Sequence, residues 1–229
     1  MNYISFFRFI DYYLGIILCF LFTLFRHLPK PHIKRKYKNN KILFIELSEM
    51  GSTILAYSAI ESALENDPNA DIYFLTFERN KSGVELLDLF NKKNILTVRD
   101  DSIFGLTVDS VKLLMNYYRI GFNICFDLEL FSRFSVILSY LTGADKRIGF
   151  HNYTNEGLYR GDLLTHKVLY NPHIHISYNF LSLVSATFKD NKELPLVKES
   201  FDNKKISVPK VNFDHAKLKK YRDLFKSGK

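Results

Sequence analysis

The turn at residues 48–53 holds the first side chains that could do chemistry. Its sequence, Ser-Glu-Met-Gly-Ser-Thr, follows an apolar run over 41–47 and precedes a helical pattern. A strand that turns into a helix leaves free backbone N–H groups and a positive dipole end at one edge of a sheet. Glu49 is a candidate general base there, because a carboxylate facing the cleft can accept a proton from a hydroxyl. The simpler alternatives are a solvated Glu49 and helix capping by Ser52 or Thr53.

The same turn lacks the glycine patterns of common nucleotide-binding loops. Gly51 is its only glycine, so the turn is neither G-x-G-x-x-G nor a loop ending in G-K-[ST]. This departure disfavours a nicotinamide-dependent enzyme and an NTPase.

A second polar cluster follows the apolar run 122–128. Asp127 and Glu129 lie two residues apart, which places both on one side of a strand and at its carboxyl end, and Arg133 follows closely. All three are candidates for substrate binding beside the first turn. The alternative is that the two carboxylates cap the next helix.

A third cluster is rich in arginine and histidine. Such side chains bind phosphate or carboxylate, since an arginine fork is bidentate and histidine donates or accepts. The residues are Arg147, His151, Arg160, His166 and His173. The alternative is a structural loop whose histidines bond the backbone. His173 and His175 lie only two apart without a third ligand, so no metal site is predicted.

The elements that must position these side chains alternate along the chain. Strands are predicted at 41–47, 72–77, 95–98, 122–128 and 146–150. Helices are predicted at about 53–66, 83–91, 108–118, 131–142 and 174–187, and another at 213–225. This order with apolar strands predicts an α/β fold, a Rossmann-like parallel sheet with helices on both faces.

The charge is unevenly distributed along the chain. Residues 1–41 carry eight Lys/Arg and one Asp, and residues 189–229 carry twelve Lys/Arg and six Asp/Glu. Of the total of 32 basic and 24 acidic residues, 12 and 17 remain in 42–188, so the middle is acidic. This argues against a nucleic-acid partner and fits a basic segment against anionic lipid. With only two cysteines, a disulfide framework is not expected and the domain is predicted to be cytoplasmic.

The N-terminal segment is strongly apolar. Residues 12–25 are 14 uncharged residues, whereas a full span needs ~20. Extension to Tyr3 includes Arg8 and Asp11. A short tilted span, an interfacial or re-entrant anchor, a signal peptide and a buried helix are the alternatives, and the signal peptide is the weakest. The basic run 26–41 predicts that the domain after it is cytoplasmic.

Four segments are therefore expected. Residues 1–28 form a hydrophobic membrane-anchor helix, 29–40 a basic linker, 41–188 a Rossmann-like domain, and 189–229 a basic tail.

Three motifs in order resemble glycosyltransferase family 9, the lipopolysaccharide heptosyltransferase family. The family has an S-x-x-G-D turn, a P-x-A-x-I stretch and a D-L-x-x-x-x-R-S-A segment that ends in R-I-G-F. Here the corresponding residues are 48–52, 68–72 and 127–150. The resemblance covers about 41–188 and implies the N-terminal, acceptor-side half of a GT-B fold. The E-x-G-S turn is similar to that of a membrane-anchored branch of the family.

The resemblance also implies roles for single residues. The family's catalytic aspartate falls on Ser52, so Glu49 is the nearest carboxylate that could replace it. Gly51 and Thr53 would shape the cleft. Arg147, His151 and His166 would face an acceptor phosphate or the donor diphosphate.

The implied function is transfer of a heptose-type sugar from a nucleotide-sugar to a lipid-linked saccharide, as in lipopolysaccharide core biosynthesis. We expect it at the cytoplasmic face of the inner membrane, anchored by residues about 3–25. No cofactor is expected beyond the nucleotide-sugar co-substrate, which would bind mainly to a C-terminal half that this chain lacks. The chain is thus expected to be a truncated or split product, with a separately encoded half among its candidate partners. The alternative is a non-catalytic, membrane-tethered module that binds a glycolipid or a protein.

Overall fold

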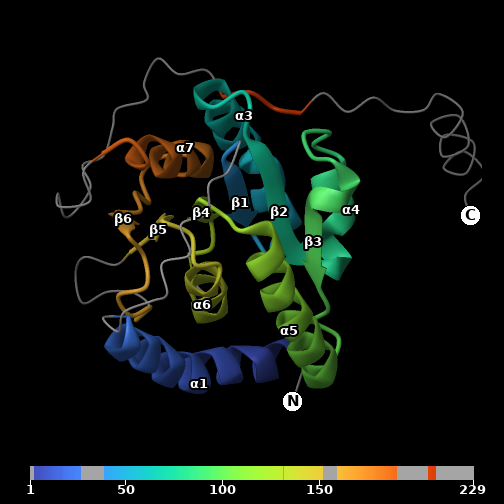
Figure 1. The fold of residues 1–229 in the computed structure, drawn as a ribbon, viewed down its shortest axis with the longest axis vertical. Coiled ribbons are helices and arrows are strands. Elements are labelled where there is room, and N and C mark those ends of the chain that lie inside the picture. Colours follow the sequence, from blue (N-terminus) through green and yellow to red (C-terminus); the bar gives the residue numbers. More distant parts are fainter. Residues whose placement is uncertain (1–2, 27–38, 131, 152–158, 190–205, 210–229) are drawn as a thin grey trace, which may run out of the picture.

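The centre of the computed structural model is a six-stranded sheet. The structure describes residues 3–26, 39–130, 132–151, 159–189 and 206–209. All neighbouring strands are parallel, in the order β3-β2-β1-β4-β5-β6 (Figure 1). The strands are β1 Lys41–Ile45, β2 Asp71–Phe77, β3 Ile95–Val98, β4 Ile124–Asp127, β5 Lys146–Phe150 and β6 His166–Val168. The predicted parallel α/β sheet is confirmed.

Helices cover both faces of the sheet. They are α1 Tyr3–Phe25, α2 Met50–Leu55, α3 Tyr57–Asn66, α4 Lys81–Glu85, α5 Ile103–Ile120, α6 Arg133–Leu141 and α7 Ile176–Ala186, with 3₁₀ turns η1 Glu78–Asn80 and η2 Lys92–Asn94. Alternation along β1 explains the two layers. Ile42 and Phe44 pack with α3, α4 and α7, whereas Leu43 and Ile45 pack with α5 and α6.

The structure differs from the local predictions in several respects. The helix after the first turn begins at Met50 and divides at Ala56 into α2 and α3. Glu49 is its N-cap residue, so the alternative that Ser52 or Thr53 caps the helix is wrong. Strand β6 was missed, because three residues that include His166 and Lys167 carry little apolar signal. The helix predicted at 83–91 is the shorter α4.

Helix α1 lies across one end of the domain (Figure 1). Its inner side packs on α6 in a small apolar cluster that includes Cys19, Val136, Tyr140 and Leu163. In the part of the chain that the structure describes, no helix is both long enough and apolar enough to cross a membrane. The predicted helix at 213–225 and most of the predicted linker and tail lie outside the described residues.

Candidate functional site

The candidate site is the turn that follows β1. Ile45 at the end of β1 is paired in register with Leu75 of β2 and Asp127 of β4, so three carboxyl ends meet at this edge. Glu46 and Leu47 continue the chain in the buried layer, and the chain reaches the surface at Ser48. In open α/β sheets, ligands bind outside the carboxyl ends of the strands.

The two candidate catalytic residues are hydrogen-bonded to each other. The hydroxyl of Ser52 donates to Oε2 of Glu49 at 3.0 Å. Glu49 is exposed, and Gly51 beside it has open space where a side chain would lie. Thr53 is buried and donates through its hydroxyl to the carbonyl of Glu49 at 3.2 Å. The turn therefore presents one solvent-facing carboxylate that a serine hydroxyl orients.

Glu129, two residues after the end of β4, holds this turn. Its Oε1 accepts the N–H groups of Leu47 and Ser48, both at 2.9 Å, and the hydroxyl of Ser48 at 2.8 Å. The side chain is buried. The structure thus brings Glu129 to the first turn, where it positions the backbone on which Glu49 is carried.

Asp127 and Arg160 form a buried ion pair behind Glu129. Arg160 also donates to the carbonyls of Glu129 and Phe150, each at 3.0 Å, and Asp127 accepts the Ser135 hydroxyl at 3.2 Å. Burial raises the pKa of Asp127 to about 6, although Arg160 acts to lower it. This pair ties the carboxyl ends of β4 and β5 to the start of α6.

Glu46 is a residue that sequence reasoning missed. It is 3% exposed and accepts the N–H of Glu49 at 3.4 Å. Burial, and then the charge of Glu129, raise the pKa of Glu46 well above the usual value. A single carboxylate inside the apolar run 41–47 was the available signal. A buried carboxyl with a raised pKa therefore lies directly behind the candidate base.

The predicted arginines are engaged inside the domain. The buried Arg133 donates through Nε to the carbonyl of Tyr159 at 2.8 Å. Arg147 lies in the amino half of β5, where it donates to the carbonyls of Leu163 at 2.8 Å and Ala144 at 2.6 Å. The structure does not bring these two to the turn, and their predicted roles in substrate binding stay predictions.

The two predicted histidines differ in position. His151 directly follows β5, at the carboxyl edge. Burial, with Lys167 and Arg160 nearby, lowers the pKa of His151 to about 4. His166 begins β6, is buried, and shares a hydrogen bond of 2.9 Å with the Thr165 hydroxyl. The described residues contain no group of three or more His, Cys, Asp or Glu side chains that could hold a metal ion.

The sheet and the helices on its two faces define a Rossmann-like α/β domain. A scan against protein-family models and a search of curated proteins return no match to this chain. Solved structures do match it. ADP-heptose lipopolysaccharide heptosyltransferase II of E. coli superposes with a TM-score of 0.58 at 15% identity, over 81% of this chain and 50% of that one.

Two further structures give the same result. E. coli heptosyltransferase WaaC with ADP has a TM-score of 0.53 at 14% identity, over 69% of this chain and 49% of that one. The family 9 glycosyl transferase of Veillonella parvula has a TM-score of 0.56 at 11% identity, over 82% and 49%. This chain spans about half the length of each. The predicted resemblance to glycosyltransferase family 9 is thus confirmed at the level of the fold.

Proposed function

We propose that this chain is the acceptor-side half of a glycosyltransferase. In this proposal it transfers a heptose-type sugar from a nucleotide-sugar, such as ADP-heptose, to a lipid-linked saccharide like that of the lipopolysaccharide core. The observation that carries the proposal is the Glu49–Ser52 pair, exposed at the carboxyl end of β1. A fold shared with two heptosyltransferases supports it.

The chemistry assigned to this pair is general base catalysis. The acceptor hydroxyl oxygen attacks the anomeric carbon, the bond from that carbon to the diphosphate breaks, and the nucleoside diphosphate leaves. Glu49 takes the proton of the attacking hydroxyl. Ser52 orients the carboxylate through its hydrogen bond, and Glu129 fixes the turn that carries both.

The proposal also includes a location and partners. The nucleotide-sugar would bind mainly to a second Rossmann half. The reaction would take place at the cytoplasmic face of the inner membrane, with residues about 3–25 as the anchor. The basic composition of residues 1–41 supports a membrane surface as partner, since anionic lipid attracts such segments.

Reconstitution tests the proposal. The full chain is combined with a C-terminal GT-B half, and labelled sugar is followed from ADP-heptose and other nucleotide-sugars to a lipid-linked saccharide. Transfer that needs both halves is the expected result. No transfer with any donor, while the chain still binds the lipid-linked saccharide, would contradict catalysis.

That last outcome would favour a second candidate, a non-catalytic module that binds a glycolipid or a protein partner. Ser52 is the observation in its favour, because a serine stands where the family has its catalytic aspartate. A serine hydroxyl alone is too weak a base to replace a carboxylate.

A further inference from the structure

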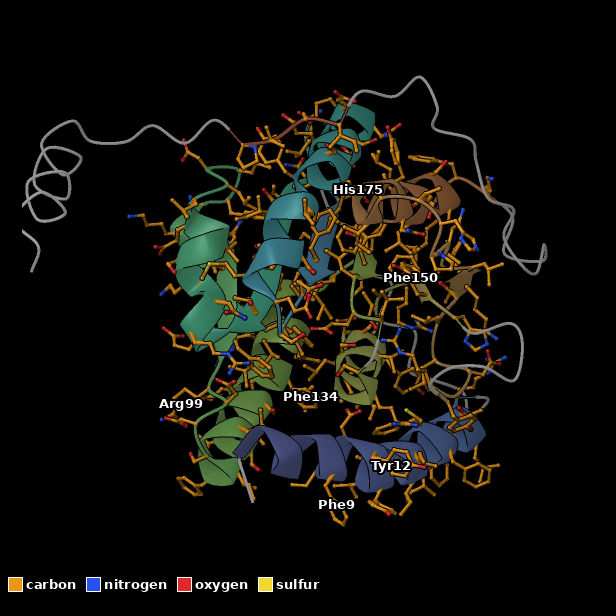
Figure 2. All side chains as sticks on the ribbon, turned by 180° about the vertical axis from the view of Figure 1, so that it is seen from behind. Phe9, Tyr12, Arg99, Phe134, Phe150 and His175 are labelled. Atoms are coloured by element: carbon orange, nitrogen blue, oxygen red, sulfur yellow. The ribbon has the colours of Figure 1, made fainter. Side chains whose placement is uncertain are left out.

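Helix α1 presents an apolar face to the outside of the molecule. Its exposed large apolar residues are Phe9, Tyr12, Tyr13, Leu14, Ile17, Phe20, Leu21, Leu24 and Phe25. Tyr13, Ile17, Phe20 and Leu24 recur at spacings of four and three, so they form one stripe. Phe9 points away from the sheet in Figure 2. A surface helix of a soluble domain normally has the opposite orientation, with its apolar stripe toward the core.

The inner face of α1 carries polar groups, and these bind the domain. Asp11 accepts the N–H of Arg133 at 3.0 Å and that of Phe134 at 2.8 Å, so it satisfies the first backbone donors of α6. The Thr23 hydroxyl accepts the N–H of Asp162 at 2.8 Å, and Arg26 forms an ion pair with the same aspartate. Polar contacts therefore fix α1 at both ends of its docked length.

Between these polar contacts, close packing holds α1 along its length against the domain. A Cβ at Gly15 would lie 2.9 Å from the Cβ of Arg133. A Cβ at Gly161 would lie 2.7 Å from the carbonyl oxygen of Cys19. The docked length from Asp11 to Arg26 is about 24 Å at 1.5 Å per residue. The helix is thus bound lengthwise to α6 and the segment after residue 159.

We propose that α1 lies flat in the membrane–water interface and inserts its outer face into one leaflet. This deepens the proposed membrane association and rests on it, but it does not depend on sugar transfer. If α1 crossed the bilayer, the docked ion pairs of Asp11 with Arg133 and Arg26 with Asp162 would enter the hydrocarbon, which is costly. A flat helix buries only its apolar side, about 5–10 Å deep.

Charge supports an anionic lipid surface as the occupant of this face. Residues 1–41 carry eight Lys/Arg and a single acid, Asp11, and that acid is turned toward α6. Among the nine exposed apolar residues named above, the side-chain polar atoms are the hydroxyls of Tyr12 and Tyr13. A protein partner would leave such a face short of the hydrogen bonds typical of protein interfaces, about one per 100–200 Å².

This orientation places the lipid beside the candidate site. The end of α6 that Asp11 caps follows the carboxyl end of β4. The hydroxyl of Ser135, in the first turn of α6, donates to Asp127 at the end of β4. Glu129, two residues further along the chain from Asp127, accepts the N–H of Ser48 in the turn that carries Glu49. The lipid-facing helix is therefore docked at the sheet edge that carries Glu49, where the saccharide of a lipid-linked acceptor would be presented.

The chain has no tryptophan, so the fluorescence of a single introduced tryptophan reports the depth of that position in the membrane without background from other tryptophans. Phe9→Trp, Ile17→Trp and Phe25→Trp replace outer-face residues of matched exposure, 54%, 55% and 50%. Each full-length variant is bound to vesicles of phosphatidylcholine and phosphatidylglycerol, and quenching by brominated lipids is measured. Equal, shallow quenching at the three positions is the expected result. Deep quenching at position 17 with shallow quenching at both ends would overturn the proposal.

A serine series tests the surface itself. Ile17→Ser with Phe20→Ser and Leu24→Ser should weaken vesicle binding at least about tenfold, because apolar area that enters the leaflet is lost. The control removes exposed apolar residues of α5, Phe104→Ser with Val111→Ser and Met115→Ser, and should leave binding unchanged.

Equal losses in both variants would overturn the proposal. A wild-type chain that does not bind vesicles but dimerises through α1 would also overturn the proposal. Normal vesicle binding without sugar transfer would count against the proposed function alone.

Discussion

Removal of the Glu129 carboxylate should loosen the turn that carries the candidate base. Glu129→Ala takes away the acceptor of three hydrogen bonds, from the N–H groups of Leu47 and Ser48 and from the Ser48 hydroxyl. The Leu47 bond is fully buried, so its N–H would be left without a partner. The substitution therefore removes favourable contacts and also leaves an uncompensated buried donor.

The size of the effect follows from those contacts. A hydrogen bond to a charged group contributes about 1.5–3 kcal/mol net, and an unsatisfied buried donor costs about 1–3 kcal/mol. One oxygen serves all three donors, so the terms do not add in full. Loss of the Glu129 charge also removes a repulsion that disfavours the charged form of Glu46, which offsets part of the cost. The expected net loss is about 3 kcal/mol in the free energy of unfolding, which lowers Tm by about 6–12 °C in a chain of this size.

Urea unfolding at pH 7 measures the loss, and hydrogen exchange locates it. The amides of Leu47 and Ser48 should exchange much faster in Glu129→Ala. Glu65→Ala is the matched control, because Glu65 is an exposed glutamate on α3. A loss below about 1 kcal/mol, or unchanged protection of the two amides, would refute the assignment of Glu129 as the residue that holds the turn.

Three further predictions concern buried groups and close contacts. The folded-state pKa of Glu46 is raised, so its contribution to stability is present at low pH and is lost as pH rises above about 4.5; Glu46→Gln should raise Tm at pH 7 and not at pH 4. The folded-state pKa of His151 is lowered from 6.5 to about 4, so stability is lost as pH falls between these values; His151→Gln should reduce that loss in urea titrations at pH 7 and pH 5. Gly161→Ala should destabilise by more than Gly143→Ala, since both glycines have positive φ (63° and 67°) but only the first meets the carbonyl of Cys19; equal changes in Tm would contradict the docked position of α1.

Strand and helix alternation was readable from the sequence because the sheet is buried on both faces. Its strands are short apolar runs between turn residues, and β3 and β5 begin and end at the predicted residues. β6 was missed, because its pairing with β5 depends on a long connection and not on local pattern. The division at Ala56 of the predicted helix into α2 and α3 likewise is not marked by a proline or a glycine in the sequence.

The candidate site was only partly predictable for a related reason. Residues that are close in sequence, such as Glu49 and Ser52, can be assigned to one turn from their spacing. Arg160 has the chemistry of an anion ligand, but its anion is the internal carboxylate of Asp127, 33 residues away. A sequence shows which groups can bind an anion and not whether the fold already supplies one.

The orientation of helix α1 depends on a few residues within a run that is otherwise apolar. Because nearly every position is apolar, the run left several alternatives open. The inward side is nonetheless marked by Asp11, Gly15, Cys19 and Thr23, which recur every four residues. Small and polar residues at this spacing indicate a face that packs closely on protein and leaves the apolar face outward.

The most direct test of the central claim is the rate of sugar transfer by Glu49→Gln in the reconstituted two-half enzyme. The amide keeps the size of the side chain but cannot take a proton, so kcat should fall by about 10²–10⁴-fold with acceptor binding unchanged. Ser52→Ala, which removes only the orienting hydrogen bond, should lower kcat by less, and the kcat of Glu65→Gln should match that of the wild type. A Glu49→Gln enzyme with the wild-type kcat would contradict the assignment of Glu49 as the base.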